Sequence, residues 1–255
     1  MASEPFIKVR NLRKYYVTIE GEKLLALDGI SFDVYEKEFV SIVGPSGCGK
    51  STFLKIVAGL TPKSDGEVIV GGKQVNEPLS GIGMVFQSPA LLQWRRVLEN
   101  VLLPIEIFRW NLEEYTQKAK NLLKFVGLEG FENKYPFELS GGMQQRVSIC
   151  RALIIDPPLL LMDEPFGALD ALTRDEMGLE LLRIWQERKK TVLFVTHSIP
   201  EAVFLSDRVV VMSPRPGRII SDIKIDLPRP RKVDVKYTQE YTDYVQSISK
   251  KILRG

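Results

Sequence analysis

The stretch FVSIVGPSGCGKST (residues 39–52) joins a short apolar run to a glycine-rich loop that ends in Lys-Ser-Thr. Phe39–Val43 is apolar at nearly every position, which predicts a strand that is covered on both faces. Gly44–Thr52 fits the pattern G-x-x-x-x-G-K-[ST], and the apolar residues that follow it begin a helix. A strand, a glycine loop and a helix in this order predict a loop that cradles phosphate groups.

Each residue type in this loop has a physical reason. Glycines allow the backbone N–H groups to close around phosphates, and the free amides at the helix start add positive potential. Lys50 supplies a point charge near the β- and γ-phosphates, and the Ser51 hydroxyl is suited to bind Mg²⁺. We interpret Cys48 as a small filler of the loop, with a redox-active thiol as the alternative. The predicted nucleotide-binding residues of the loop are Gly44, Pro45, Ser46, Gly47, Cys48, Gly49, Lys50, Ser51 and Thr52.

A second apolar run, Leu159–Met162, ends in two adjacent carboxylates. Neighbouring residues of a strand point to opposite faces, so Asp163 and Glu164 are expected to do different work. We assign Asp163 to the metal ion and Glu164 to the attacking water, as general base; a solvated strand end is the alternative. The phosphate loop alone leaves kinases, GTPases, helicases and transport ATPases open, but the sequence lacks the guanine-reading motif Asn-Lys-x-Asp.

Two further polar side chains follow apolar runs. His197, the only histidine, comes after Val192–Val195, and Gln87 comes after Met84–Phe86. Because ligands of open α/β sheets bind at the carboxyl ends of the strands, both side chains are expected beside the phosphate loop. We predict a γ-phosphate contact for His197, with a structural or surface role as the alternative. The neutral amide of Gln87 is suited to contact Mg²⁺ or water.

A second glycine-rich helix start follows Leu139. Ser140, Gly141 and Gly142 open a helical pattern that ends at Asp156. A hydroxyl and two glycine amides at a helix N-terminus predict another anion site. An ordinary N-cap with permissive glycines is the alternative.

The rest of the chain predicts a mixed α/β fold. Residues 6–43 alternate between apolar and polar, as half-buried antiparallel strands do, and residues 67–75 indicate a hairpin around two glycines. Residues 100–155 form a mostly helical insertion, in which Asn111 and Glu114 predict a capping box. After Ser213 several prolines predict an irregular stretch, and residues 241–252 indicate a terminal amphipathic helix.

Composition sets the remaining bounds. The 255 residues include 35 Lys+Arg and 32 Asp+Glu, a net charge of +3 that is too small to indicate nucleic acid as a partner. Hydrophobic residues at 44% and charged residues at 26% exclude disordered, collagen-like and coiled-coil classes. Cys48 and Cys150 are too few for a disulfide framework or a four-ligand zinc site. No membrane-spanning run or signal peptide is apparent, so we expect the chain in the cytoplasm.

Taken together, the motifs resemble those of the ATP-binding-cassette (ABC) family over nearly the whole chain. Residues 44–52 are similar to its Walker A motif, Leu159–Glu164 to Walker B, Leu139–Gln144 to the signature, Ala168–Asp170 to the D-loop, Gln87 to the Q-loop and His197 to the H-loop. Six ordered motifs at suitable intervals are highly specific.

The resemblance implies a P-loop NTPase core, with a mostly parallel sheet, an N-terminal antiparallel β subdomain and a helical signature subdomain. The expected single nucleotide-binding domain comprises core residues 1–87 and 159–212, helical residues 88–158 and a C-terminal extension, 213–255. It implies ATP as ligand, with Mg²⁺ held by Ser51, Gln87 and Asp163. It also implies a homodimer, because in this family Ser140, Gly141, Gly142 and Asp170 of one subunit complete the site around ATP held by the other.

The family also stacks an aromatic ring on adenine. The position that resembles it is Tyr16, with Tyr15 or an ordinary strand tyrosine as alternatives.

Other segments of the sequence, with less specific motifs, resemble the nitrate, sulfonate and taurine branch of importers. Residues 86–101 are similar to the permease-facing region, and Leu91, Leu92 and Trp94 are expected to form a groove for a permease helix, with core packing as the alternative. Residues 212–220 and 226–231 add to this likeness. Met143 and Gln93 depart from the pattern, where Gln and Pro are common.

The branch implies an ATPase subunit at the cytoplasmic face of the membrane. Its partners would be a separate permease, contacted by residues 87–94, and an extracytoplasmic solute-binding protein. An exporter motor and a soluble ABC ATPase that acts on DNA or ribosomes remain as alternatives. The basic residues of the extension are interpreted as a solvated face, with contact to anionic lipid as the alternative; they are Arg215, Arg218, Arg229, Arg231 and Lys232.

Overall fold

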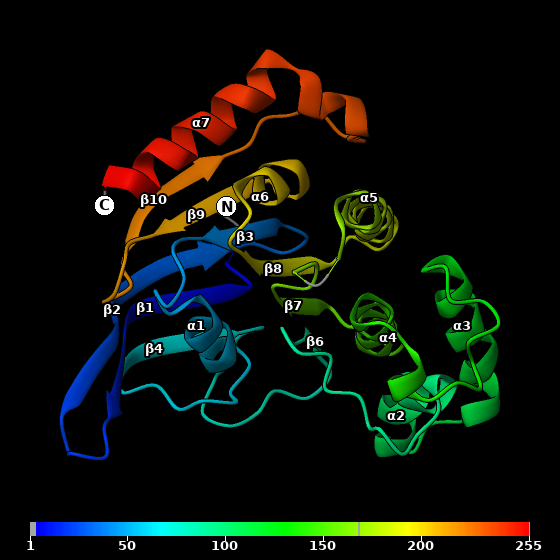
Figure 1. Ribbon diagram of the computed structural model, residues 1–255. Helices are drawn as coiled ribbons and strands as arrows, with labels where there is room; N and C mark the ends of the chain where they lie inside the picture. Colours follow the sequence, from blue (N-terminus) through cyan, green and yellow to red (C-terminus); the bar gives the residue numbers. More distant parts are fainter. Residues whose placement is uncertain (1–3, 168, 255) are drawn as a thin grey trace.

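The computed structural model describes residues 4–167 and 169–254, and their strands form two sheets (Figure 1). The central sheet has the order β10-β9-β3-β8-β7-β6. Its strands are β3 (Phe39–Val43), β6 (Gly83–Val85), β7 (Leu159–Asp163), β8 (Thr191–Thr196), β9 (Arg208–Met212) and β10 (Ile219–Lys224). All neighbours run parallel except β10, which is antiparallel to β9. The apolar runs predicted as buried strands are therefore confirmed as parallel strands of one sheet.

The central strands are covered on both faces. Along β7, Leu159 and Leu161 belong to the apolar core shared with the antiparallel sheet and α1 (Lys50–Val57), whereas Leu160 and Met162 belong to the core shared with the other helices. Burial on both faces explains why these strands are continuously apolar in sequence.

The second sheet has the order β2-β1-β4-β5 and is antiparallel, as predicted. It contains β1 (Ile7–Val17), β2 (Lys23–Val34), β4 (Asp65–Val70) and β5 (Lys73–Gln74). The hairpin between β4 and β5 is confirmed. Its turn residues, Gly71 and Gly72, have φ of +56° and +75°, which favours glycine at both positions.

The helices lie on both sides of the central sheet and beyond its β6 edge. Figure 1 shows α2 and α3 gathered beyond β6, and α7 alongside β10 at the opposite edge. Besides α1, they are α2 (Val97–Ile107), α3 (Leu112–Phe125), α4 (Gly141–Leu153), α5 (Ala171–Arg188), α6 (Ile199–Leu205) and α7 (Gln239–Arg254), with 3₁₀ turns at Pro136–Glu138 and Val233–Tyr237. No helix within the described ranges is both long enough and apolar enough to span a bilayer.

Two local predictions need correction. Asn111 caps α3, but its side chain accepts from the Glu113 N–H at 3.1 Å instead of forming a two-way box with Glu114. The helix at residues 97–107 agrees with the predicted helical insertion, although it includes Pro104. The stretch after Ser213 is not wholly irregular, because residues 219–224 pair with β9 as an edge strand.

Candidate active site

The glycine loop closes around the ammonium group of Lys50. Its Nζ donates to the carbonyl oxygens of Gly44 and Pro45, at 2.9 and 3.0 Å, and the side chain is buried. Gly49 precedes α1 with φ of +104°, and a Cβ there would come within 2.6 Å of a Leu27 methyl carbon. The loop conformation therefore requires glycine at this position.

Asp163, the last residue of β7, faces the start of α1. It is 3% exposed, and its Oδ1 accepts a hydrogen bond from the Ser51 hydroxyl at 2.8 Å. Burial raises the pKa of Asp163, the Ser51 hydrogen bond opposes that shift, and the nearby Glu164 charge adds to it. A nearby cation would stabilise the ionised form. One carboxylate and one hydroxyl suit Mg²⁺, which is usually bound by few protein oxygens together with phosphates.

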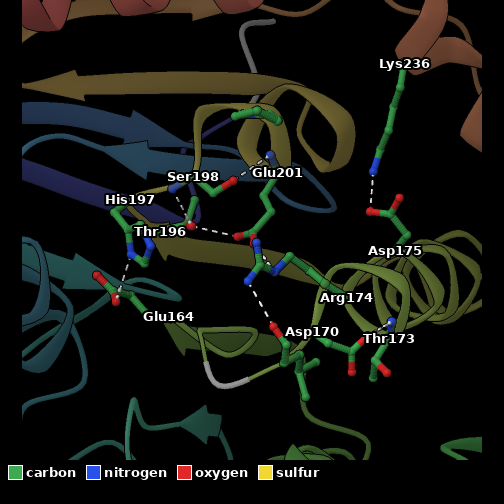
Figure 2. A network of polar contacts seen from close by, with 12 residues as sticks. Glu164, Asp170, Thr173, Arg174, Asp175, Thr196, His197, Ser198, Glu201 and Lys236 are labelled. Atoms are coloured by element: carbon green, nitrogen blue, oxygen red, sulfur yellow. Dashed lines mark hydrogen bonds and ion pairs between the residues drawn. The ribbon is translucent and has the colours of Figure 1, made fainter.

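Glu164 faces a different set of side chains. Its Oε2 lies 3.2 Å from Gln87 Nε2. The same oxygen lies 3.1 Å from His197 Nδ1, a contact that Figure 2 shows. Its backbone has φ of +46°, and its N–H donates to the Val195 carbonyl at 2.8 Å. Gln87, Glu164 and His197 follow the neighbouring strands β6, β7 and β8, so the sheet order brings them together at one edge.

A cavity of about 260 Å³ lies between the loop and Glu164. Ser46, Gly47, Gly49, Lys50, Ser51, Thr52, Gln87, Glu164 and Arg215 line it. Arg215 is the lining residue that sequence reasoning missed. Its Nη2 donates to the Gly47 carbonyl at 3.4 Å. Its loop packs closely on the phosphate loop, since a Cβ at Gly217 would lie 2.1 Å from the Cys48 carbonyl oxygen. A proline-rich stretch so distant in sequence carries no motif that would have indicated this contact.

The basic residues of the extension do not form one solvated face. Arg231 is buried, Arg229 pairs with Asp207 at 2.8 Å, and Arg218 pairs with Asp28. The solvated-face interpretation is therefore wrong for Arg229 and Arg231, and a guanidinium inside the fold is not available to lipid.

The signature residues lie outside the cavity lining. Ser140 caps α4, where its hydroxyl accepts from the Met143 N–H at 3.3 Å. Asp170 caps α5 by accepting from the Thr173 N–H at 3.0 Å, which holds its pKa below the usual range. Gly141 and Gly142 occupy the first turn of α4. Ala168 lies outside the described residues.

Two smaller expectations concern the edges of the site. The Tyr16 hydroxyl lies 3.3 Å from the Thr52 hydroxyl and its side chain is exposed, whereas Tyr15 makes no such contact within residues 4–167 and 169–254. Burial raises the pKa of the Cys48 thiol, which disfavours the thiolate and supports its interpretation as a filler.

The residues that were expected to form a permease groove do not line one cavity together. Leu91 is buried, Trp94 is 74% exposed, and neither lines a cavity of about 370 Å³ nearby. Apolar residues of β6 and α2, and the residues that directly follow these elements, line it instead; they include Met84, Phe86, Leu103, Pro104, Ile107 and Phe108. The prediction for Leu91 is wrong because that side chain is part of the core packed with α2.

A buried lysine in a glycine loop, at the carboxyl end of a parallel strand and beside a buried aspartate, defines a P-loop nucleotide-binding protein. The family model described as "ABC transporter" matches residues 27–167. The chain belongs to this family and is an ATPase that binds and hydrolyses ATP.

Similar curated proteins cover most of the chain. An uncharacterized ABC transporter ATP-binding protein of Methanocaldococcus jannaschii is 52% identical, over 95% of this chain and 89% of that protein. A taurine import ATP-binding protein of Rhizobium johnstonii is 47% identical, over 88% of this chain and 85% of the relative. An aliphatic sulfonates import ATP-binding protein of Bacillus cereus is 42% identical, over 97% and 94%.

Solved structures support the same fold. The dimeric structure of a bacterial ABC transporter cassette has a TM-score of 0.79 and 38% identity, covering 87% of this chain and all of that one. A dimeric post-hydrolysis state of the same cassette, bound to ADP and Pi, has a TM-score of 0.77 and 35% identity over the same shares.

Proposed function

We propose that this chain is the ATPase subunit of an importer for a small anion such as taurine, another sulfonate or nitrate. The identity of 42–47% to taurine and aliphatic sulfonate import proteins supports the substrate class. The single observation that supports the catalytic assignment is the Glu164 carboxylate, which lies between Gln87 and His197 at the mouth of the loop cavity.

In the proposed reaction, the chain's own groups hold the triphosphate and move one proton. Lys50 and the loop amides bind the β- and γ-phosphates, and Asp163, Ser51 and Gln87 hold Mg²⁺, which would neutralise charge on the phosphates. Glu164 accepts a proton from water as the water oxygen bonds to the γ-phosphorus and the bond to the β–γ bridging oxygen breaks. His197, held beside Glu164, contacts the transferred phosphoryl group. Tyr16 stacks on adenine.

The active unit of this proposal is a homodimer around two MgATP. Ser140, Gly141, Gly142 and Asp170 lie outside the cavity lining of their own chain, so each site needs these residues from a second copy. The dimeric state of the similar cassette supports this arrangement. The helical residues 88–158 carry the signature, and residues 1–87 and 159–212 form the ATPase core within one domain of 255 residues.

The chain would act at the cytoplasmic face of the membrane. The apolar groove between β6 and α2, next to residues 87–94, would receive a separate permease, and a solute-binding protein would deliver the anion from outside. Vesicles that contain the permease and the chain should take up taurine, a sulfonate or nitrate only with ATP. Uptake of none of these anions would refute the substrate class.

Glu164→Gln tests the catalytic assignment. Loss of the general base should lower ATP turnover by about 10²- to 10⁴-fold, while ATP binding and ATP-dependent dimers are retained. Glu129→Gln is a matched control, because that carboxylate is exposed and pairs only with Lys124 at 2.8 Å among the described residues. Turnover of the Glu164 variant at the wild-type rate would contradict the assignment.

A further inference from the structure

Glu201, a largely buried glutamate, accepts a hydrogen bond from the residue that precedes His197. The Thr196 hydroxyl donates to Glu201 Oε2 at 2.7 Å, and the Ser198 N–H donates to the Thr196 hydroxyl oxygen at 3.0 Å. The Glu201 N–H in turn donates to the Ser198 hydroxyl oxygen at 3.4 Å. Figure 2 shows the Glu201 carboxylate between Thr196 and Arg174. The carboxylate of Glu201 therefore contacts Thr196 directly, and Ser198 is linked to it through the Thr196 hydroxyl.

The other oxygen of this carboxylate faces Arg174 of α5. Arg174 Nε lies 3.2 Å from Glu201 Oε1, an ion pair without hydrogen-bond alignment, and Arg174 Nη2 donates to the Leu169 carbonyl at 3.0 Å. The Glu201 side chain is only 12% exposed. Leu169 is buried and directly precedes Asp170. Polar contacts thus run from Thr196, which directly precedes His197, through Glu201 and Arg174 to the segment that begins α5 (Figure 2).

We propose that Glu201 and Arg174 are positioning residues that hold the Leu169–Asp170 backbone in register with His197. The planar guanidinium bridges a carboxylate and a backbone carbonyl, a geometry that lysine cannot reproduce. His197 and the Leu169–Asp170 segment, which would complete the site of the second copy, then move as one unit. This proposal rests on the dimer of the proposed function, since Asp170 acts there on the partner's site.

The neighbouring ion pair on α5 provides a matched control. Lys236 of the C-terminal extension pairs with Asp175, and their side chains are 21% and 40% exposed (Figure 2). In the described part of the chain, neither side chain hydrogen-bonds Thr196 or Leu169. This pair joins the extension to α5 without touching the chain of contacts from His197 to Asp170.

The stability of a Glu201 variant distinguishes a positioning role of this residue from a role in folding. Burial raises the pKa of Glu201, although the Thr196 hydrogen bond and Arg174 oppose this shift. The isosteric amide of Glu201→Gln keeps the size of the side chain but removes one charge of the pair, which can lower stability. The melting temperature of this variant is therefore measured at the pH of the assays, and activity is compared at a temperature where the variant is fully folded, so that a loss of activity is not a consequence of unfolding.

The test compares Glu201→Gln, Arg174→Met, the double variant and the controls Asp175→Asn and Lys236→Met in the full chain. The measurements are kcat and KM for MgATP, ATP affinity of the monomer, and ATP-dependent dimerisation in the Glu164→Gln background. Each single variant should lower kcat and the dimerisation constant about tenfold, because small misplacements of reacting groups are costly. Monomer ATP affinity should stay within about twofold, and the double variant should be no worse than either single one because the residues act together.

The controls should leave kcat and dimerisation within about twofold of the wild type. Any of three results would overturn the proposal. They are wild-type kcat and dimerisation in Arg174→Met, losses equal to those of the control variants, and additive losses in the double variant. If Arg174→Met does not fold, Arg174→Lys provides the same test, because one ammonium cannot bridge Glu201 and Leu169. Wild-type turnover in Glu164→Gln alone would instead overturn the proposed function, so the two failures are distinguishable.

Discussion

Arg231 makes a quantitative prediction about the C-terminal extension. Its side chain is 4% exposed, and Nη1 donates to the carbonyl oxygens of Val203, Phe204 and Ser206 at 3.1, 2.9 and 2.8 Å. These acceptors lie at the end of α6, where the last helical carbonyls have no partner within the helix. Burial lowers the pKa of Arg231 to about 10, so the guanidinium remains charged at neutral pH. The extension therefore caps α6 from outside.

Replacing Arg231 by methionine keeps most of the buried volume but removes these donors. The two N–H groups of Nη1 are shared among the three carbonyls, and at about 1.5 to 3 kcal/mol for each hydrogen bond of a charged donor the free energy of unfolding should fall by about 3 to 6 kcal/mol. At about 2 to 4 °C per kcal/mol for a chain of this size, the melting temperature should fall by about 10 °C. Urea unfolding, followed by the fluorescence of the tryptophans, measures the free energy directly.

Lys232→Met is the matched control, because its side chain is exposed and adjacent in sequence. It should change the free energy of unfolding by no more than about 0.5 kcal/mol. A loss below about 1 kcal/mol in Arg231→Met would refute the reasoning, since it would mean that the α6 carbonyls do not depend on the guanidinium.

Three further outcomes are expected. His197→Ala should abolish hydrolysis but retain ATP-dependent dimers, as measured by phosphate release and light scattering; unchanged turnover would leave the histidine a structural role. Arg215→Met should weaken ATP binding several-fold, and the loss should be smaller at high salt, because the Arg215 guanidinium lines the cavity and has no ion pair among the described residues. Equal ATP affinity of the variant and the wild type at low salt would argue against this. Because the pKa of Glu201 is raised on folding, stability from its protonated form is present below its unfolded pKa and lost as pH rises through its folded pKa. The melting temperature of Glu201→Gln relative to the wild type should therefore increase as the pH rises above 4.5, the ordinary pKa of the side chain, and a constant difference in calorimetry would contradict this.

The features that sequence reasoning predicted correctly have local physical signals. Phe39–Val43 and Leu159–Met162 are apolar at every or nearly every position because both faces of their strands are covered, and the glycine pair between β4 and β5 has the positive φ that its turn requires. The helix after Ser140 begins where its N-cap indicates. Such signals lie within a few residues of one another and need no knowledge of the rest of the chain.

The wrong predictions concern side chains whose surroundings come from distant elements. Leu91 and Trp94 were expected to share a groove, but one is buried against α2 and the other is exposed. Arg231 carries the sequence signal of a surface residue, yet α6 and the extension enclose it. The strand at residues 219–224 lies among prolines and forms only because β9 offers a free edge.

The sequence by itself determined the phosphate loop and the identity of the polar groups at the strand ends, because glycine conformations and strand periodicity are properties of short segments. Only the tertiary structure decided that Gln87 and His197 both contact the Glu164 carboxylate and that Arg215 lines the same cavity. It also decided that Arg174 connects Glu201 to Leu169. These contacts depend on the order of β6, β7 and β8 and on the packing of α5 against α6. That order follows from how the whole chain buries both faces of the central sheet, which no short segment specifies.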